Sequence, residues 1–360
     1  MRAAILRQTN QPLVVEEIDY PEPPAGHIRV RLKASGVCHS DWHVLKGEWG
    51  DRIPVPVIMG HEGSGVVDQV GEGVTGLALG DHVVLSWRSP CGHCETCLQG
   101  WPSLCERSPL VGNRARVDGD PMHQMVNLGS FATHTVVPEV AAVTIDPAIN
   151  FEVAALVGCG VATGVGAAIN TARVTAGSSV AVFGCGGVGL NVIQGARLAG
   201  AAQIIAIDKL AAKLELARRF GATNAVNAGA GDPVAAIQDL TDGRGVHFAF
   251  EAIGVVSEPF VQSVRCTRQR GTTVWVGHAP VGTPVPLDAR DLIQEKTVMG
   301  CMYGSCRPRI DFPRLLNLYQ QGRLMLDELI THRFSLDEIN DAFACLAAGE
   351  VARSIIVFED

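Results

Sequence analysis

The fold of the middle of the chain is decided by residues 180–189, Val-Ala-Val-Phe-Gly-Cys-Gly-Gly-Val-Gly. The four apolar residues at its start predict a short buried strand, and residues 188–199 predict the helix that follows. Glycines spaced Gly-x-Gly-x-x-Gly between a strand and a helix are the fingerprint of a dinucleotide-binding turn. The motif residues are Gly184, Gly186, Gly187, Val188 and Gly189.

The glycines of this turn have separate predicted roles. Gly184 allows the tight turn, Gly186 lets a pyrophosphate approach the backbone, and Gly189 lets the helix meet the strand. Free N–H groups at the helix N-terminus then face the phosphates. Asp208 lies nineteen residues beyond Gly189, at the end of the next predicted strand, where a carboxylate can accept from both ribose hydroxyls. Because a 2′-phosphate would be repelled there, we expect NAD rather than NADP. The alternative is a glycine-rich loop without a ligand, in which Asp208 caps the next helix.

Strands and helices alternate after this turn. Apolar strands that alternate with helices are typical of a doubly wound parallel sheet, so the middle of the chain is predicted to be an α/β domain. The strands are predicted at 204–207, 248–251 and 273–276, and a helix at 211–220 that ends at Gly221.

The rest of the chain has a different pattern. Residues 1–150 contain short strands, such as 28–32 and 65–67, broken by glycine and proline, which predicts a β-rich, irregular domain. We expect the tail beyond about residue 300 to return to this first domain. Its predicted elements are two helical stretches, 312–321 and 336–348, and a terminal strand at 354–358.

Length and charge narrow the possible functions. A chain of 360 residues exceeds one compact core, which favours two domains. The formal net charge of −8 argues against a nucleic-acid partner, because such proteins usually present a basic face. Residues 153–169 are the longest uncharged stretch, and their glycine and alanine content predicts a poor membrane span. No signal-peptide pattern opens the chain, so we expect a cytoplasmic protein without a membrane partner.

The chain has eleven cysteines, four of which are crowded together. The spacing Cys-x2-Cys-x2-Cys-x7-Cys lets four thiolates surround one tetrahedral zinc ion with no open position, which predicts a structural site. One alternative is an iron–sulfur cluster, because its cysteine ligands have similar short spacings. The other is four cysteines that lie close together without binding a metal. The odd count without a secretory signal favours metal over disulfides. The four residues are Cys91, Cys94, Cys97 and Cys105.

A second constellation is dispersed along the chain. Cys38 begins the sequence Cys-His-Ser-Asp, His61 and Glu62 lie in Gly-His-Glu-Gly, and Cys159 lies between two glycines. Each alone is ordinary, because a lone cysteine is usually a small core residue. Their spacing in the sequence does not show whether they meet.

The order of all these motifs resembles the zinc-containing medium-chain alcohol dehydrogenases over essentially the whole chain. Residues 156–170 and the tail 349–358 are most similar to the branch with class III alcohol dehydrogenases and thiol-dependent formaldehyde dehydrogenases. The resemblance implies an NAD-binding Rossmann domain over 161–298. It also implies a β-rich, GroES-like catalytic domain made of residues 1–160 and 299–360.

The resemblance also implies a catalytic zinc, in addition to the structural one, held by Cys38, His61 and Cys159 with an open fourth position. Asp41 would hydrogen-bond the histidine ligand, and Glu62 would lie behind the metal. Ser40 would bond the alcohol oxygen and begin a proton relay, through the cofactor ribose, to His43 at the surface. Trp87 would line the substrate pocket. His39, at a position where many relatives have arginine, would also contact the cofactor. The other implied cofactor contacts are Thr163, Lys213, Val276 and Arg353.

The implied function is reversible hydride transfer between a primary or secondary alcohol and NAD, giving an aldehyde or ketone. The alternative is dehydrogenation of a thiol–formaldehyde adduct or of a polyol. Class III enzymes bind the anionic thiol adduct through an arginine, and only Arg114 and Arg116 are candidates for that residue here. The alternatives from other functional classes are a cofactor-binding protein without catalytic activity and a zinc-ribbon protein that binds nucleic acid. A homodimer or homotetramer, formed through the nucleotide domain, is expected.

Overall fold

The computed structural model describes residues 1–349 and 352–359, so positions 350 and 351 of the 349–358 tail lie outside the described residues. The chain forms two compact units. One consists of Met1–Cys159 together with Arg307–Asp360, and the other of Gly160–Cys306. The tail therefore returns to the N-terminal unit, as its sequence predicts.

The second unit is built on a six-stranded sheet whose pairings are all parallel. Its strand order, β13-β12-β11-β14-β15-β16, reverses direction at β11, which is the Rossmann order. The doubly wound sheet predicted from the sequence is confirmed. The strands are β11 (Ser179–Phe183), β12 (Gln203–Asp208), β13 (Asn224–Asn227), β14 (Val246–Glu251), β15 (Thr267–Trp275) and β16 (Thr297–Gly300).

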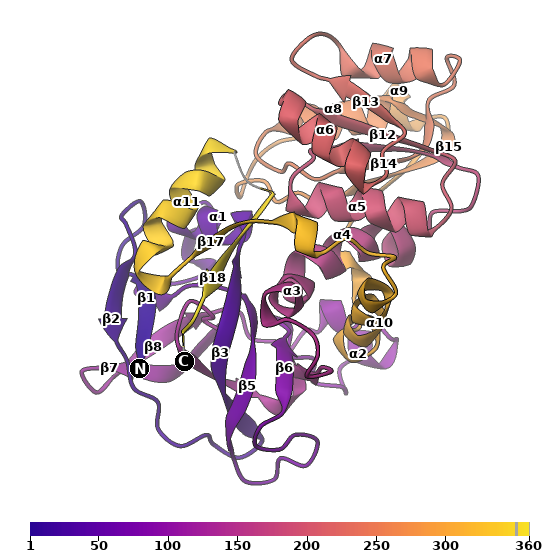
Figure 1. Ribbon diagram of the computed structural model, residues 1–360. Coiled ribbons are helices and arrows are strands. Elements are labelled where there is room, and N and C mark those ends of the chain that lie inside the picture. Colours follow the sequence, from indigo (N-terminus) through magenta and orange to yellow (C-terminus); the bar gives the residue numbers. More distant parts are fainter. Residues whose placement is uncertain (350–351, 360) are drawn as a thin grey trace. The chain divides into compact units, whose positions relative to one another are not determined.

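Helices connect these strands. Figure 1 shows α5 and α6 lying against the strands of this sheet, with α7 next to α8. Helix α6 ends at Gly221, whose φ of 117° lies in the left-handed region that favours glycine at a helix C-terminus. The helices are α4 (Ala162–Gly166), α5 (Gly187–Leu198), α6 (Ala211–Phe220), α7 (Pro233–Leu240), α8 (Ser257–Arg265) and α9 (Ala289–Leu292).

The first unit contains two sheets. One has the order β2-β1-β4-β8-β7, and the other β10-β6-β5-β3-β18-β17 with β9 also paired to β3. The strands are β1 (Arg2–Leu6), β2 (Val14–Glu17), β3 (His27–Val37), β4 (Val57–Ile58), β5 (Glu62–Val70), β6 (His82–Leu85), β7 (Val111–Val117), β8 (Asp120–Met125), β9 (His134–Pro138), β10 (Ala142–Thr144), β17 (Ile330–Phe334) and β18 (Arg353–Val357). Strand β18 pairs antiparallel with β3, which fixes the C-terminal tail in the N-terminal unit.

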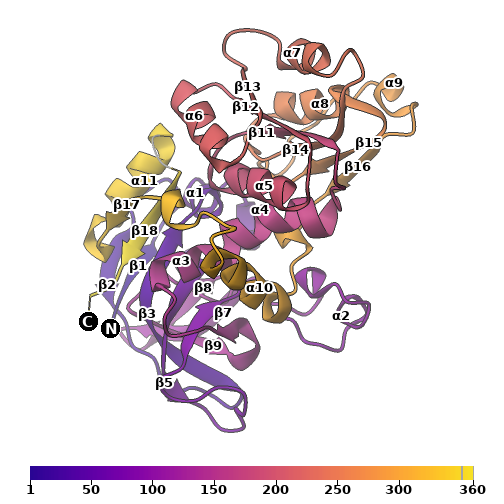
Figure 2. The ribbon, with the colours of Figure 1, turned by 45° about the vertical axis from the view of Figure 1, so that its right-hand side comes forward.

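Helices of this unit cover its sheets and connect its strands. Figure 2 shows α3 beside β3, whereas α2 lies on a lobe that stands away from the sheets. The helices are α1 (His39–Leu45), α2 (Glu95–Leu98), α3 (Phe151–Leu156), α10 (Pro308–Gln320) and α11 (Ile339–Ala348).

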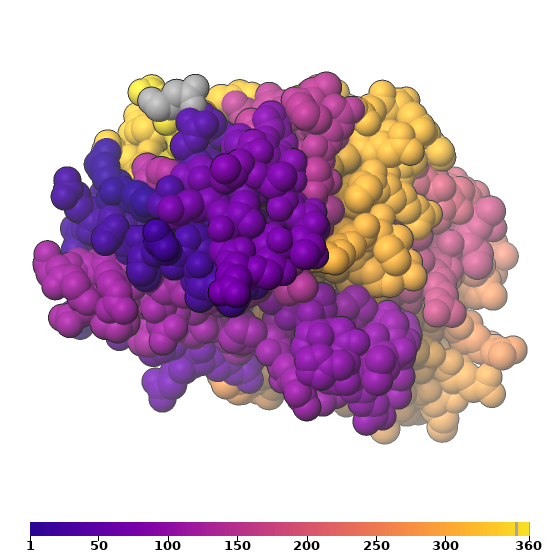
Figure 3. All heavy atoms as spheres, turned by 90° about the horizontal axis from the view of Figure 1, so that it is seen from below, coloured from indigo at the N-terminus to yellow at the C-terminus, as the bar shows by residue number. Residues whose placement is uncertain are grey.

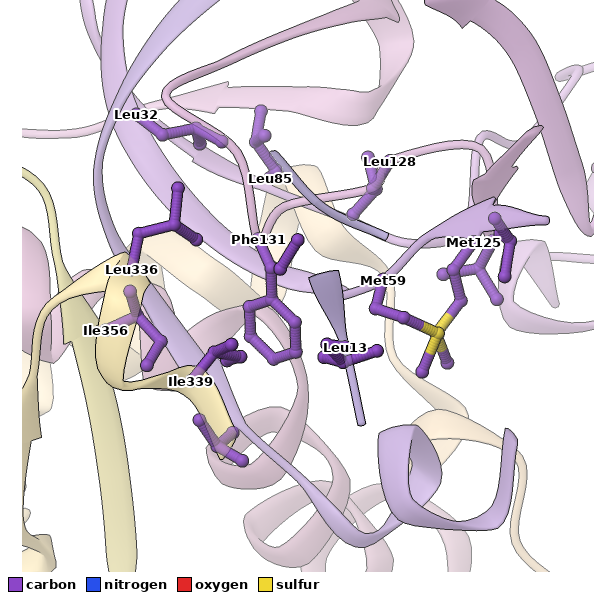
Figure 4. Packing of buried hydrophobic residues seen from close by; sticks show 14 of the residues in the cluster. Leu13, Leu32, Met59, Leu85, Met125, Leu128, Phe131, Leu336, Ile339 and Ile356 are labelled. Atoms are coloured by element: carbon purple, nitrogen blue, oxygen red, sulfur yellow. The ribbon is translucent and has the colours of Figure 1, made fainter. Parts of the chain in front are cut away.

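A core of apolar side chains joins the N-terminal strands to the C-terminal tail. Phe131 is fully buried, and Figure 4 shows its ring among side chains from both parts of the chain. Burial of a large apolar side chain stabilises a fold by about 1.5–3 kcal/mol, so these contacts hold the tail in place. The neighbours labelled there include Leu13, Met59, Met125, Leu336, Ile339 and Ile356.

The second predicted domain boundary is corrected by the structure. The sequence placed it between residues 298 and 299, whereas the units divide between Cys306 and Arg307. Strand β16 pairs with β15 and therefore extends the parallel sheet beyond residue 298. The first boundary, expected after residue 160, lies after Cys159.

The apolar stretch near residue 160 is helical. The helix Phe151–Thr171 is long and apolar enough to cross a membrane by length and composition, but 83% of its most apolar window is buried inside the protein. This burial is what a core helix shows. The helix contains two wider π-helical segments, Val157–Val161 and Ala167–Thr171, and π-bulges often mark functional positions.

Candidate active site and metal centres

Four side chains from distant parts of the sequence meet in the first unit. Cys38 follows β3, His61 and Glu62 lie at the start of β5, and Cys159 lies in the first π-helical segment. One ligand atom from each residue lies within 4.8 Å of those of the others. The pairing of β3 with β5 brings the first three together, because Gly36 faces Glu62 in the antiparallel register.

The hydrogen bonds around His61 leave one ring nitrogen directed to this cluster. His61 Nδ1 lies 2.9 Å from Asp41 Oδ1, and Asp41 is fully buried. The Nδ1–H group donates to the carboxylate, so Nε2 carries the lone pair. His61 Nε2 is buried without a hydrogen-bond partner, as is Glu62 Oε1. A buried imidazole nitrogen without a partner, next to two thiols, fits a zinc ligand whose ring is oriented by a carboxylate.

The charges in this cluster are strongly coupled. The hydrogen bond shared by the two thiols lowers the pKa of Cys38 well below its usual value and raises that of Cys159. Burial opposes the charged form of His61, but the neighbouring Asp41 and Cys38 raise its pKa well above 6.5. A metal ion binds thiolates and neutral imidazole, so its binding releases protons from this set.

Glu62 belongs to the same cluster and forms a buried ion pair. Its Oε2 accepts from Nη2 of Arg353, and the side chains are 0% and 5% exposed respectively. Burial raises the pKa of Glu62, while the Arg353 guanidinium lowers it. Arg353 was expected to contact the cofactor, and in the structure its guanidinium is paired with Glu62.

The second metal centre is a closed set of four sulfurs. The ligand atoms of Cys91, Cys94, Cys97 and Cys105 lie within 4.8 Å of one another, and no histidine or carboxylate belongs to the group. The backbone N–H of Cys91 donates to Cys105 Sγ and that of Cys94 to Cys91 Sγ, both at 3.3 Å. Four thiolates with N–H donors around them suit a structural zinc with no open position.

The lobe that carries this set has little apolar core of its own. In Figure 3 the violet residues near position 100 form a rounded protrusion. Its helix α2 has four residues, and the large apolar side chains of Leu98, Trp101 and Leu104 are 74%, 39% and 47% exposed. Since these side chains are not packed inside, a zinc ion bound by the four cysteines would cross-link a lobe that has few apolar contacts of its own.

The predicted nucleotide turn connects β11 to α5 in the second unit. Gly184 has a φ of 91°, and a Cβ atom on Gly189 would lie 1.8 Å from the Gly184 carbonyl oxygen, so both positions require glycine. A Cβ on Gly186 would meet no atom within 4 Å. This open side of the turn, at the start of a helix, fits the approach of a phosphate.

Asp208 ends β12, as predicted, and both of its oxygens accept backbone hydrogen bonds. Oδ2 accepts from the N–H of Cys185 at 2.9 Å, and Oδ1 from that of Leu210 at 3.0 Å. Asp208 therefore holds the glycine turn and the start of the following segment. Each carboxylate oxygen can accept a second bond, so these contacts leave acceptor capacity for ribose hydroxyls.

The remaining predicted site residues occupy varied environments. Ser40 and Trp87 are partly exposed, and His39 is exposed at the start of α1. Trp87 packs at the edge of the hydrophobic core, with the Arg88 guanidinium 5.3 Å from its ring centroid. In the second unit Thr163 and Lys213 are partly exposed, whereas Val276 is buried and its N–H donates to the Glu251 carbonyl.

The expected surface position of His43 is wrong. The residue is 2% exposed, and its Nδ1 is hydrogen-bonded to Glu48 Oε2. Glu48 was not predicted from the sequence; its position five residues after His43, just beyond the end of α1, is the signal that could have indicated it.

A buried acid in the second unit was also missed. Glu251 ends β14 with 0% exposure, and burial raises the pKa of its carboxyl to about 7. Its position at the carboxyl end of a parallel strand, where sites gather in such sheets, could have indicated it.

Comparisons with known proteins agree with this geometry. The family model described as alcohol dehydrogenase GroES-like domain matches residues 24–147, and that described as zinc-binding dehydrogenase matches residues 187–321. The alcohol dehydrogenase class-3 of Cereibacter sphaeroides is 37% identical and the S-(hydroxymethyl)glutathione dehydrogenase of Escherichia coli 38% identical, each over 99% of both chains.

A solved structure gives the same result. Benzyl alcohol dehydrogenase from Acinetobacter calcoaceticus is 35% identical with a TM-score of 0.93, over 99% of both chains. The similarity extends over both units, so it includes the GroES-like fold and the Rossmann sheet. The chain therefore belongs to the zinc-dependent medium-chain alcohol dehydrogenases and is an oxidoreductase of that family.

Proposed function

We propose that this enzyme transfers hydride reversibly between a primary or secondary alcohol and NAD, giving an aldehyde or ketone. The observation that supports it most is the cluster of Cys38, His61, Glu62 and Cys159, in which His61 Nε2 is buried without a hydrogen-bond partner. Two thiolates and one imidazole are a ligand set typical of catalytic zinc, which keeps one position for water or substrate, whereas structural zinc is closed by four protein ligands. When bound, zinc acidifies the alcohol and the nicotinamide accepts the hydride.

The side chains of the protein would orient the reactants and move the proton. Asp41 keeps His61 in the tautomer that presents Nε2, through the 2.9 Å hydrogen bond. Ser40 accepts the proton of the alcohol as it ionises, and His43 receives it from the relay. In aldehyde reduction the same residues return the proton to the alkoxide.

The glycine turn and Asp208 support NAD as the cofactor. Asp208 lies at the carboxyl end of β12, one strand from the turn, and its N–H partners fix the carboxylate there. A charged acceptor at this place favours the two hydroxyls of an unmodified ribose and repels a 2′-phosphate. Lys213, Thr163 and Val276 complete the proposed cofactor contacts of this unit.

The alternative substrate is an S-hydroxymethyl thiol, the class named in one of the relatives, or a polyol. A thiol adduct such as that of glutathione would need a cation for its carboxylates. Arg114 is largely engaged by the protein itself, because its Nε donates to the Val136 carbonyl and its Nη2 to the carbonyl and Oδ1 of Asn127. Arg116 donates to Gly119 within its own hairpin. Because both arginines are hydrogen-bonded within the protein, these contacts favour a neutral alcohol over a substrate with carboxylates.

A substrate panel tests this proposal. NAD reduction should be measured with aliphatic alcohols, benzyl alcohol, sorbitol and formaldehyde premixed with glutathione. If the proposal is right, kcat/KM is highest with an aliphatic alcohol or benzyl alcohol. A thiol adduct or sorbitol preferred over every simple alcohol would favour the alternative, and the absence of NAD reduction with any of them would refute both.

We also propose a cytoplasmic homo-oligomer, a dimer or a tetramer. Strand β16 lies at the edge of the parallel sheet, and residues near it expose apolar side chains, with Ile293 79% and Met299 37% exposed. An apolar sheet edge favours pairing with another copy. Sedimentation equilibrium would measure the number of subunits, and a monomer at micromolar concentration would contradict the proposal.

A further inference from the structure

The imidazole of His43 is almost fully shielded from water. His43 lies on α1, and its side chain is 3% exposed, whereas that of Glu48 is 30% exposed. The two side chains are joined by a hydrogen bond between His43 Nδ1 and Glu48 Oε2. The backbone also links the pair, because the N–H of Glu48 donates to the His43 carbonyl at 2.9 Å.

A second side chain lies nearly parallel to the ring. The Trp49 indole and the imidazole have an interplanar angle of 15° and 6.5 Å between their centroids. The Glu48 carboxylate, which is hydrogen-bonded to Nδ1, determines the tautomer of His43. Since a carboxylate only accepts, Nδ1 carries the proton and Nε2 is left as the acceptor.

We propose that Glu48 positions His43 and is the outlet through which the relay delivers its proton to water. The inference rests on the proposed function, because it needs a proton released from the alcohol. His43 Nε2 accepts that proton, the Nδ1 proton passes to the Glu48 carboxylate, and water takes it from there. Each alcohol oxidised releases one proton to water and leaves His43 neutral with its proton on Nε2. The Nδ1–H tautomer is restored before the next turnover, when Nε2 gives its proton to water and Glu48 passes one from water back to Nδ1.

A purely structural role is the competing explanation. The pair could only hold the segment after α1, in which case its removal would change stability but not the path of the proton. A partly exposed ion pair contributes about 0–1 kcal/mol, so this role would be modest. The Arg7–Glu16 pair is a suitable control, because it is also a partly exposed ion pair of a glutamate and is remote in sequence.

The test compares Glu48→Gln, Glu48→Asp, His43→Gln and the double variant His43→Gln/Glu48→Gln, with Glu16→Gln as the control. We expect Glu48→Gln to lower kcat for alcohol oxidation at pH 7 about tenfold with little change in KM, less than the 10²–10⁴-fold typical of losing an acid–base group itself. Imidazole buffer should restore the rate by taking the proton directly, and Glu48→Asp should keep most of it.

The double variant shows whether Glu48 acts through His43. If it does, His43→Gln/Glu48→Gln should be no slower than His43→Gln alone. An independent measurement is the nitrogen NMR spectrum of histidine-labelled protein, with His43 assigned by its loss in His43→Gln. Wild-type protein should show the Nδ1–H tautomer, and Glu48→Gln should shift the tautomer equilibrium.

The outcomes separate this inference from the proposed function. A Glu48→Gln enzyme with the wild-type rate, no response to imidazole and an unchanged tautomer would overturn the role of Glu48 alone. Rate losses that simply add in the double variant would also overturn it. A wild-type enzyme that oxidises no alcohol would contradict the proposed function and this inference with it.

Discussion

Replacing Glu251 with glutamine should make the Rossmann unit more stable at alkaline pH. The carboxyl is 0% exposed, and burial raises its pKa to about 7, although the N–H groups of Gly254 and Ile253 lower it. Both N–H groups donate to Oε1, at 2.9 and 2.8 Å, while Oε2 is buried without a partner. Glutamine keeps the oxygen that accepts and cannot ionise.

The direction and size of the expected stability change follow from the pKa values of Glu251 in the folded and unfolded chain. Its pKa rises from 4.5 in the unfolded chain to about 7 in the folded state, so folding favours the protonated form. The stabilisation that the protonated carboxyl of Glu251 contributes is complete below pH 4.5 and is lost as pH rises to about 7. At 1.36 kcal/mol per pKa unit, the loss reaches about 3 kcal/mol. The Glu251→Gln variant lacks this loss, so its advantage over wild type should grow by that amount between pH 4.5 and 8.

Trp275 provides the assay, because it is the only tryptophan in the second unit. Urea unfolding should be followed at several pH values by fluorine NMR of protein labelled with 5-fluorotryptophan. Glu258→Gln is the control, since that residue is an exposed glutamate on α8 of the same unit. A free-energy difference between Glu251→Gln and wild type that stays constant from pH 4.5 to 8 would show that ionisation of Glu251 does not change the stability of this unit.

Three further predictions concern the metal lobe, the cofactor and the substrate. Cys97→Ala should leave the structural site incomplete, lower the melting temperature and expose the lobe to limited proteolysis; unchanged proteolysis would show that zinc is not what holds the lobe. Asp208→Ser should reduce the preference for NAD over NADP, which we expect to be on the order of a thousandfold in wild type, and steady-state kinetics that give an unaltered ratio would remove Asp208 from the cofactor site. Trp87→Ala should raise the relative kcat/KM for bulky secondary alcohols, whereas equal effects on all substrates would indicate only lost core packing.

Features set by short segments were predictable from the sequence. The nucleotide turn depends on glycines within six positions, and its requirements at Gly184 and Gly189 follow from backbone geometry alone. The end of α6 at Gly221 is local in the same way. The four-cysteine set was equally predictable, because ligands close in sequence can surround one ion without knowledge of the fold.

Features that depend on long-range packing were not predictable from spacing. The meeting of Cys38, His61 and Cys159 requires the register of β3 with β5 and the π-helical segment, so the sequence supplied it only through a resemblance. The pairing of Glu62 with Arg353 joins residues 291 positions apart. The burial of His43 depends on the fold of the segment after α1, and no periodicity signals it.

The separation of the two metal sites can also be tested through the metal itself. Zinc content and NAD reduction should be measured on the same preparations of wild type and Cys38→Ala. Wild type should contain two zinc ions per chain and turn over, whereas Cys38→Ala should contain one zinc ion, show no turnover and still bind NAD. A Cys38→Ala enzyme that keeps both zinc ions and full activity would contradict the assignment of the catalytic site.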